Sequence, residues 1–413
     1  MVDGAFIVYF KLFKNKTPTL NEYLQMCGVK DIERYLNPKD CRESPYHYVN
    51  MQEAVSYLYN AIHDAKNYNE HIYIIQGPDV DGLCSSYIAY KFLLDNDVPR
   101  NTIKMLVHTT KSHNLDDEIM AQINDDCKYL IIPDAGSNDM EQLWELSNRG
   151  IYILIADHHK IEYNLNDYPP NVVLVNSTIQ ELENPYLSGT GVMWKIIEGF
   201  YIDGSDESYL PYVALANLSD VMNISSLENR WLNKLMEVET EVLGADYNIC
   251  MSGLNKNLND NGYLTPTNVT WNITPKLNAC IRNGDINVRR MLFGILNAKN
   301  IDFIDQTIPT LKSIHREQQE YVKEMFGNIV KDIDATNNII VGFVDNTAYT
   351  GLVANKVCWD YNKPTFLLYE KYGEYYGSCR SPVPLKDKCI ESGLFTFASG
   401  HDSSFGVALP KEN

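Results

Sequence analysis

Short apolar segments alternate with amphipathic segments over residues 51–176, and this alternation constrains the fold more than any other feature. The apolar segments are "HIYII", "TIKMLVHT", "YLIIPDAG", "IYILIADHH" and "NVVLVN". Between them, apolar residues recur at helical spacing, as in 51–68 with Ala54, Leu58, Ala61, Ile62 and Ala65. Buried strands that alternate with helices are typical of a parallel sheet covered on both faces. We therefore predict an α/β fold.

Acidic and imidazole side chains stand where three of these strands end. They are Asp79, Asp81, Asp134, Asp157, His158 and His159. Asp220 lies near the end of a further predicted helix, over 209–222. Open α/β sheets bind ligands at the carboxyl ends of their strands. We therefore expect these side chains along one rim of the sheet.

This rim has the composition of a metal centre. Carboxylates with a little imidazole suit Mn²⁺ or Mg²⁺ better than a tight zinc site. Two such ions about 3.5–4 Å apart can activate a water and neutralise a phosphoryl group. Each aspartate alone is explained as a helix cap or turn residue. The occurrence of four such motifs in one chain favours the metal centre.

Charge and cysteine usage limit the partners and the compartment. The chain has 35 basic and 54 acidic residues, a net charge of −19, so a polyanion needs a local basic groove or metal ions to bind. The nine cysteines are scattered without a CxxC pair, which argues against a disulfide framework and for a reducing compartment. The start "MVDGAFIVYFKLFKNK" has no signal-peptide pattern, and no apolar run approaches the roughly 20 residues of a membrane span. We expect a cytoplasmic protein with no membrane association.

The pattern changes towards the carboxyl end. Residues 300–333 predict one long charged helix that Pro309 interrupts early. From Asn337, the segments "NNIIVGFVD", "PTFLLYEKYGEYYGSCRS" and "SSFGVALP" predict strands, with "GLVANKVCWDYN" as a helix among them. This is a second, smaller α/β domain. On the preceding helix in "VRRMLFGILNAK", Arg289 and Arg290 are interpreted as a solvated face, with a wall of a nucleic-acid groove as the alternative.

The order of these motifs and the residues within them resemble the DHH phosphoesterase superfamily and, within it, the RecJ exonucleases. "PDVDGLCSS", "IIPDAG", "IADHHK" and "ANLSDVMN" resemble the four DHH motifs, and "PKLNACIRNGD" resembles a motif typical of RecJ. "YTGLVANKVCWDYNKPTFLL", "GSCRSP" and "SGHDSSFG" resemble the accessory DHHA1 domain. The resemblance implies a DHH domain with a lead-in over 1–299, a connector helix over 300–335 and a substrate-binding DHHA1 domain over 336–413.

The resemblance also implies a role for each candidate residue. Ligands to two Mn²⁺ or Mg²⁺ ions would be Asp79, Asp81, Asp134, His158 and Asp220. Asp157 would orient His158, and His159 would face the substrate phosphate as the second catalytic residue. The residues that bind the nucleic-acid backbone or a terminal phosphate would be Asn278, Arg282, Ser378, Arg380, Gly400 and His401.

The chain departs from the family pattern in its first motif. Family members have a further ligand there, at the positions that hold Gly77 or Ile75 in this chain. One metal site should therefore be weakened or completed by water. Ser399 also replaces a glycine of the DHHA1 signature, and we expect no additional OB-type domain, which reduces the grip on single strands.

The activity that the resemblance implies is a 5′-to-3′ exonuclease on single-stranded DNA, which releases 5′-mononucleotides through attack by a metal-activated water. One alternative is a phosphodiesterase for short oligonucleotides or cyclic dinucleotides, favoured by the acidic composition. Another is a scaffold subunit with a weakened metal site, favoured by Gly77. The expected partner is a single-stranded nucleic acid or a short oligonucleotide, and the sequence predicts no particular protein partner.

Overall fold

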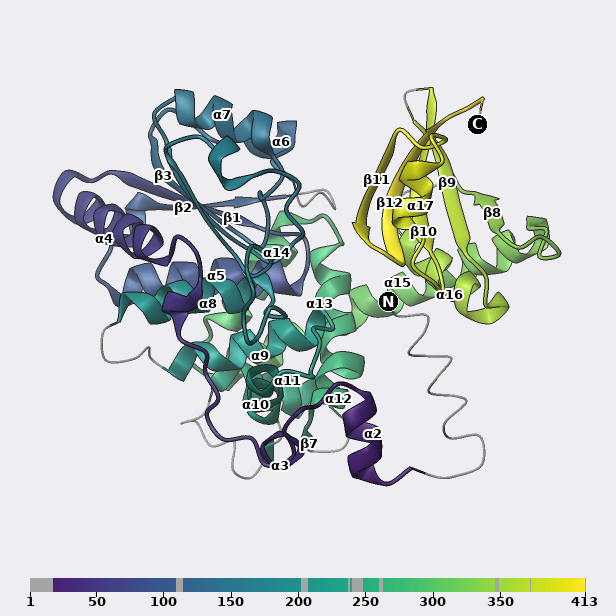
Figure 1. The fold of residues 1–413 in the computed structure, drawn as a ribbon, viewed down its shortest axis with the longest axis horizontal. Coiled ribbons are helices and arrows are strands. Elements are labelled where there is room, and N and C mark those ends of the chain that lie inside the picture. Colours follow the sequence, from purple (N-terminus) through teal and green to yellow (C-terminus); the bar gives the residue numbers. More distant parts are fainter. Residues whose placement is uncertain are drawn as a thin grey trace. The chain divides into compact units, whose positions relative to one another are not determined.

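The computed structural model divides the chain into two units, Met1–Leu311 and Lys312–Asn413 (Figure 1). The structure describes residues 18–108, 114–201, 207–236, 238–239, 248–259, 263–345, 349–371 and 373–412. The start of the chain, on which the absence of a signal peptide was predicted, lies outside the described residues. The predicted bounds of the DHH domain (1–299), the connector helix (300–335) and the DHHA1 domain (336–413) remain predictions. No helix in the described ranges is both long and apolar enough to cross a membrane.

The first unit is built on a five-stranded parallel sheet, as predicted, and the order of its strands is β2-β1-β3-β4-β5. Its strands are β1 (His71–Gln76), β2 (Ile103–Val107), β3 (Cys127–Pro133), β4 (Tyr152–Asp157) and β5 (Val172–Asn176). The chain leaves β1 on one side to form β2 and returns on the other side to form β3. The strand order therefore reverses between β1 and β3, the position where open α/β sheets bind ligands.

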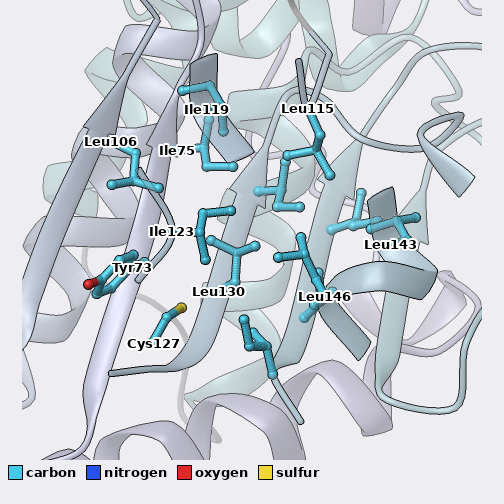
Figure 2. Close-up of a cluster of buried hydrophobic side chains, with 14 of the residues drawn as sticks. Tyr73, Ile75, Leu106, Leu115, Ile119, Ile123, Cys127, Leu130, Leu143 and Leu146 are labelled. Atoms are coloured by element: carbon cyan, nitrogen blue, oxygen red, sulfur yellow. The ribbon is translucent and has the colours of Figure 1, made fainter. Parts of the chain in front are cut away.

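Helices cover both faces of this sheet. One face packs against α6 (Asp117–Met120) and α7 (Met140–Asn148), and Figure 2 shows their side chains, such as Ile119 and Leu143, in one apolar cluster with Tyr73 and Leu130. The other face packs against α4 (Met51–Tyr68), α5 (Val80–Asp95) and α8 (Gly189–Phe200). Helix α6 ends at Met120, and the chain enters β3 through a turn in which the Asn124 carbonyl accepts from Cys127 N–H.

A helical part of the first unit follows the sheet. Its elements are α9 (Leu210–Ser219), α10 (Leu227–Lys234), α11 (Ile249–Leu258), α12 (Pro266–Asn268), the π-helix η5 (Val269–Ile273), α13 (Thr274–Ile281) and α14 (Ile286–Leu296). The short strands β6 (Val238–Glu239) and β7 (Tyr263–Leu264) pair nearby, and α2 (Leu20–Met26) and α3 (Ile32–Leu36) precede the sheet. The interpretation of Arg289 as solvated is wrong: it is 2% exposed on α14, whereas Arg290 is exposed.

Helix α15 (Ile301–Asp332) spans the division between the units and continues through Pro309 rather than being interrupted there. The second unit contains a five-stranded sheet of order β11-β12-β10-β9-β8. Its strands are β8 (Ile340–Phe343), β9 (Thr365–Lys371), β10 (Glu374–Arg380), β11 (Phe397–His401) and β12 (Ser404–Pro410). Helix α16 (Thr350–Tyr361) covers one face, and α17 (Lys386–Glu391) contributes Cys389 to a core cluster with Cys379 and Phe405.

Candidate metal centre

The turn from β1 into α5 carries the first two candidate ligands, and two glycines make it possible. A Cβ on Gly82 would lie 2.4 Å from the Cα of Gly77, so the strand end and the helix start touch only because both lack side chains. Asp79 caps α5, and its Oδ1 accepts from Gly82 N–H at 2.9 Å. Asp81 follows in the first helical turn.

Asp81 is held by the amino end of α8. Its carboxylate is buried and accepts from Gly189 N–H at 2.7 Å, from Thr190 N–H at 2.8 Å and from the Thr190 hydroxyl at 2.6 Å. A helix amino terminus favours a negative charge through its free N–H groups and its dipole. No role was predicted for Gly189 or Thr190 from the sequence. The visible signal is Ser188, which caps a helix that starts with Gly-Thr-Gly.

Asp134 follows β3 in a left-handed conformation, with φ of 65°. Its N–H donates to Ala156 of β4 at 2.7 Å, which fixes the backbone there. The amino end of α8 lies directly against it, because a Cβ on Gly189 would be only 2.5 Å from the Cβ of Asp134. Gly189 therefore lets the helix that holds Asp81 also contact Asp134, and this brings the two carboxylates into one cluster.

Asp157 ends β4 and organises the two histidines that follow it. Its Oδ1 accepts from the backbone N–H of His158 at 2.7 Å and from Nδ1 of His159 at 2.7 Å. Burial raises the pKa of Asp157, but the neighbouring His159 imidazole outweighs this and holds the pKa well below its usual range. Asp157 thus contacts His158 through the backbone and His159 through the ring.

His158 brings the separate motifs together. Its side chain is 6% exposed, and its Nε2 lies 3.2 Å from Asp134 Oδ1, 3.6 Å from Asp220 Oδ2 and 3.8 Å from Asp81 Oδ2. Asp220 reaches this position as the C-cap residue of α9. Ligand atoms that could share one ion form two groups in the described part of the chain: Asp134, Asp157, His158 and His159; and Asp81, His158 and Asp220.

The cluster fits a divalent cation. Asp134 Oδ1 and Asp220 Oδ2 are buried and accept no hydrogen bond from any described residue. Burial and then repulsion from Asp81 and Asp79 raise the pKa of Asp134 well above its usual range and that of Asp220 to about 8. Several buried carboxylates without hydrogen-bond donors are costly to ionise together, and a bound cation removes this cost.

Asp79 and Gly77 stand at the edge of this arrangement. Asp79 is partly exposed and belongs to neither ligand group, so its role as a ligand stays a prediction. A Cβ on Gly77 would lie 3.7 Å from Asp134 Oδ2, so a side chain at position 77 would start towards the cluster. The same Cβ would lie 2.9 Å from the Cα of Gly82, which is closer than backbone tolerates.

The predicted substrate-binding residues fall into two places. Asn278 and Arg282 lie on or just after α13 in the first unit, and both are partly buried. In the second unit, Arg380 pairs with Ser404, which pairs with His401, so all three side chains share one sheet face. Ser378 lies on the same face two residues away, where its Oγ is 3.1 Å from Thr350 Oγ1, and Gly400 adjoins His401 with φ of 126°.

Comparison with known proteins places the sheet and its rim in a family. The profile of the DHH family, N-terminal domain, matches residues 71–218, which contain β1 to β5 and every rim residue except Asp220. Residues 71–218 are a DHH domain. The resemblance inferred from the motifs is thereby confirmed for this domain.

Relatives of the whole chain extend the comparison beyond the DHH domain. YorK of Bacillus subtilis (strain 168), provisionally named as an SPbeta prophage-derived single-strand DNA-specific exonuclease, is 24% identical over 94% of this chain and 70% of its own length. The fold is that of RecJ from Thermus thermophilus in complex with Mn²⁺, with a TM-score of 0.75 at 18% identity over 94% of this chain. The chain spans 56% of that RecJ. A manganese-bound exonuclease RecJ matches with a TM-score of 0.70 at 17% identity, over 88% of this chain and 91% of its own.

Proposed function

We propose that this protein is a metal-dependent phosphodiesterase that degrades single-stranded DNA from its 5′ end and releases 5′-mononucleotides. The observation that carries the proposal is the cluster around His158 Nε2, where three carboxylates from distant motifs meet at the reversal point of the sheet. The names and bound ions of the relatives support the same chemistry.

Two divalent ions, Mn²⁺ or Mg²⁺, would supply the activated water and neutralise the charge on the phosphoryl group. Asp81, Asp134, His158 and Asp220 would hold them, with Asp79 as a further ligand. The weaker site would be the one next to Gly77, where family members have another ligand. The mixture of carboxylate and imidazole favours Mn²⁺.

His159 would bind the substrate phosphate. Although burial lowers its pKa, the Asp157 carboxylate raises that pKa to about 9, which favours the protonated imidazole. Because Asp157 accepts from Nδ1, it fixes the orientation of the imidazole ring, and a protonated imidazole can donate hydrogen bonds to phosphate oxygens. Asp157 therefore acts by holding His159 charged and by fixing the backbone of His158.

The second unit would bind the substrate rather than perform the chemistry. We assign residues 336–413 as a DHHA1 domain that recognises a phosphate with Ser378, Arg380, Gly400 and His401. Arg380, Ser404 and His401 lie side by side across three strands, an arrangement that can surround an anion. Asn278 and Arg282 in the first unit would contact the nucleic-acid backbone.

Digestion of labelled single strands tests the proposal. Strands with a 5′ or a 3′ label are incubated with the full chain and Mn²⁺, with Mg²⁺ and with a chelator, and Asp134→Ala is the control. We expect metal-dependent release of the 5′ label as a mononucleotide and no product from Asp134→Ala. If neither label is released with any divalent ion, the proposal is wrong.

A phosphodiesterase for short oligonucleotides is the second candidate, because a chain with a net charge of −19 repels a long polyanion wherever it lacks a basic groove. Rates on a dinucleotide and on a long strand distinguish the two activities. Calorimetry with Mn²⁺ addresses the scaffold alternative, which requires that no specific divalent ion binds.

A further inference from the structure

Trp271 is a large aromatic side chain that the fold leaves in solvent. It lies in η5 (Val269–Ile273), the π-helical turn that leads into α13, and it is 74% exposed. Tryptophan side chains usually bury 150–250 Å² on folding, so exposure on this scale forgoes a large stabilising contribution. π-Helical turns are rare and occur frequently at functional sites. Both observations indicate a role other than packing.

The π-helical turn is attached to the candidate metal centre. Helix α9, which ends at Ser219 and places Asp220 in the cluster, packs against η5. The Ser219 hydroxyl lies 3.0 Å from the hydroxyl of Thr274, the first residue of α13 and the third after Trp271. The contact between Ser219 and Thr274 therefore connects the segment of Trp271 to the end of α9, where Asp220 follows.

Polar side chains continue from this junction along α13. Thr274, Asn278 and Arg282 are spaced by four residues, so they share one face of the helix. Exposure increases along this face, from buried Thr274 to partly buried Asn278 and Arg282. Asn278 Oδ1 is shielded from solvent and has no hydrogen-bond partner in the described part of the chain. This face thus carries an amide and a guanidinium, whose N–H groups can donate to phosphate oxygens, on the helix whose first residue contacts the end of α9.

The local charge also fits a nucleic acid. The chain has 54 acidic residues, yet none falls within 261–284, which contains Trp271, Lys276 and Arg282. The stretch itself therefore contributes no negative charge that would repel a phosphate backbone. An exposed aromatic ring within a stretch that lacks acidic residues is the composition of a base-stacking groove.

We propose that Trp271 is a stacking platform for one base of a single strand whose backbone runs along the Thr274–Arg282 face of α13. The inference rests on the proposed function and specifies how that site grips its substrate. Because every base has a π-face, the contact tolerates any sequence and requires an unpaired base. It adds a source of affinity that depends on bases rather than on phosphates.

Binding of a fluorescent 5′-phosphorylated oligothymidylate, measured by anisotropy, tests the contact. The protein is the full chain with Asp134→Asn, which prevents hydrolysis, with and without Trp271→Ala. Loss of one stacked base should weaken binding by about 5- to 150-fold. Trp271→Phe should restore most of the affinity. Trp144→Ala is the matched control, since Trp144 is 43% exposed on α7 in the first unit and has no assigned role in substrate binding, and it should bind like the parent.

An oligonucleotide without bases separates stacking from general damage. Trp271→Ala should not weaken binding of an abasic strand, because that strand has no base to stack on the ring. Equal binding of oligothymidylate by the parent and Trp271→Ala would overturn the inference while leaving the proposed function intact. An equal loss on the abasic strand would also overturn it. If the chain with Asp134 intact neither binds nor cleaves single strands, both proposals fail.

Discussion

The carboxylates of the candidate metal centre oppose one another when no cation is present. Asp134 is 1% exposed, and burial together with Asp81 and Asp79 raises its pKa well above the usual range. Asp220 shares this environment, with a pKa raised to about 8. These residues therefore lower the stability of the metal-free chain but allow it to bind metal, and such a loss of stability is common at functional sites.

Asp134→Asn should make the metal-free chain more stable and abolish its response to metal. The amide replaces an acid whose ionised form is disfavoured by burial and by Asp81 and Asp79, and we expect a gain of about 0.5–2 kcal/mol in the free energy of unfolding. For the parent chain, Mn²⁺ at about 100 times its Kd should add about 2.7 kcal/mol. Thermal unfolding with Mn²⁺ and with a chelator measures both effects. A metal-dependent shift that survives in Asp134→Asn would exclude this residue as a ligand.

Gly77→Asp should strengthen metal binding and weaken the fold. A side chain at position 77 starts towards Asp134 Oδ2 but forces the Gly82 backbone to move. Gly77→Ala is the matched control, because it introduces the same steric conflict without a ligand. We expect both variants to unfold at lower temperature and only Gly77→Asp to bind Mn²⁺ more tightly by calorimetry. Unchanged affinity in Gly77→Asp would mean that the alignment of this motif with RecJ is wrong.

At the scale of elements, the amino end of α8 is the main support of the centre. It donates three hydrogen bonds to Asp81, from Gly189 N–H, Thr190 N–H and the Thr190 hydroxyl. It also contacts Asp134 through the missing side chain of Gly189. The helix thus sets the separation between two candidate ligands that come from different strands.

Thr190→Val should lower metal affinity by about 10–100-fold, the usual effect of removing a hydrogen bond to a ligand. Thr102→Val is the control: Thr102 is equally buried, and its hydroxyl donates to Pro99 C=O at 2.7 Å in a 3₁₀ turn (Arg100–Thr102) that precedes β2. Both variants should lose about 1 kcal/mol of stability. Calorimetry should find weaker Mn²⁺ binding in Thr190→Val alone. A loss of affinity in both would point to general destabilisation.

At the scale of the whole molecule, we propose that catalysis belongs to the first unit and that the second unit adds a separate phosphate-binding site. The cluster of ligands lies in Met1–Leu311, and the row of Arg380, Ser404 and His401 lies in Lys312–Asn413. Chemistry and affinity should therefore respond to different substitutions.

Arg380→Ala should raise KM for a 5′-phosphorylated strand by about 10- to 150-fold, the range for a hydrogen bond to a charged group, and leave kcat and Mn²⁺ affinity nearly unchanged. Lys388→Ala is the control, because Lys388 is exposed on α17. Steady-state kinetics on strands with and without the 5′ phosphate measure the effect. Equal KM values for the parent and Arg380→Ala would remove Arg380 from the substrate site.

The strands of the first sheet and the polar residues at its rim follow from local sequence patterns. Hydrophobic periodicity is a local property, so the five strands of the first sheet and α4 follow from it. Strand-end positions are also local, and parallel strands bring their carboxyl ends to one edge, so the strand pattern alone is enough to place Asp134 and His158 together.

The surroundings of those residues depend on how distant segments pack together. The N–H donors to Asp81 come from Gly189 and Thr190, which are more than 100 positions away along the chain. Packing between elements likewise buries Arg289 and leaves Trp271 exposed. It also brings Gly77 and Gly82 so close that a side chain at either position would clash with the other. Such contacts arise from the summed packing of the whole unit, and no local pattern encodes them, because the same short segment can be buried or exposed according to its neighbours.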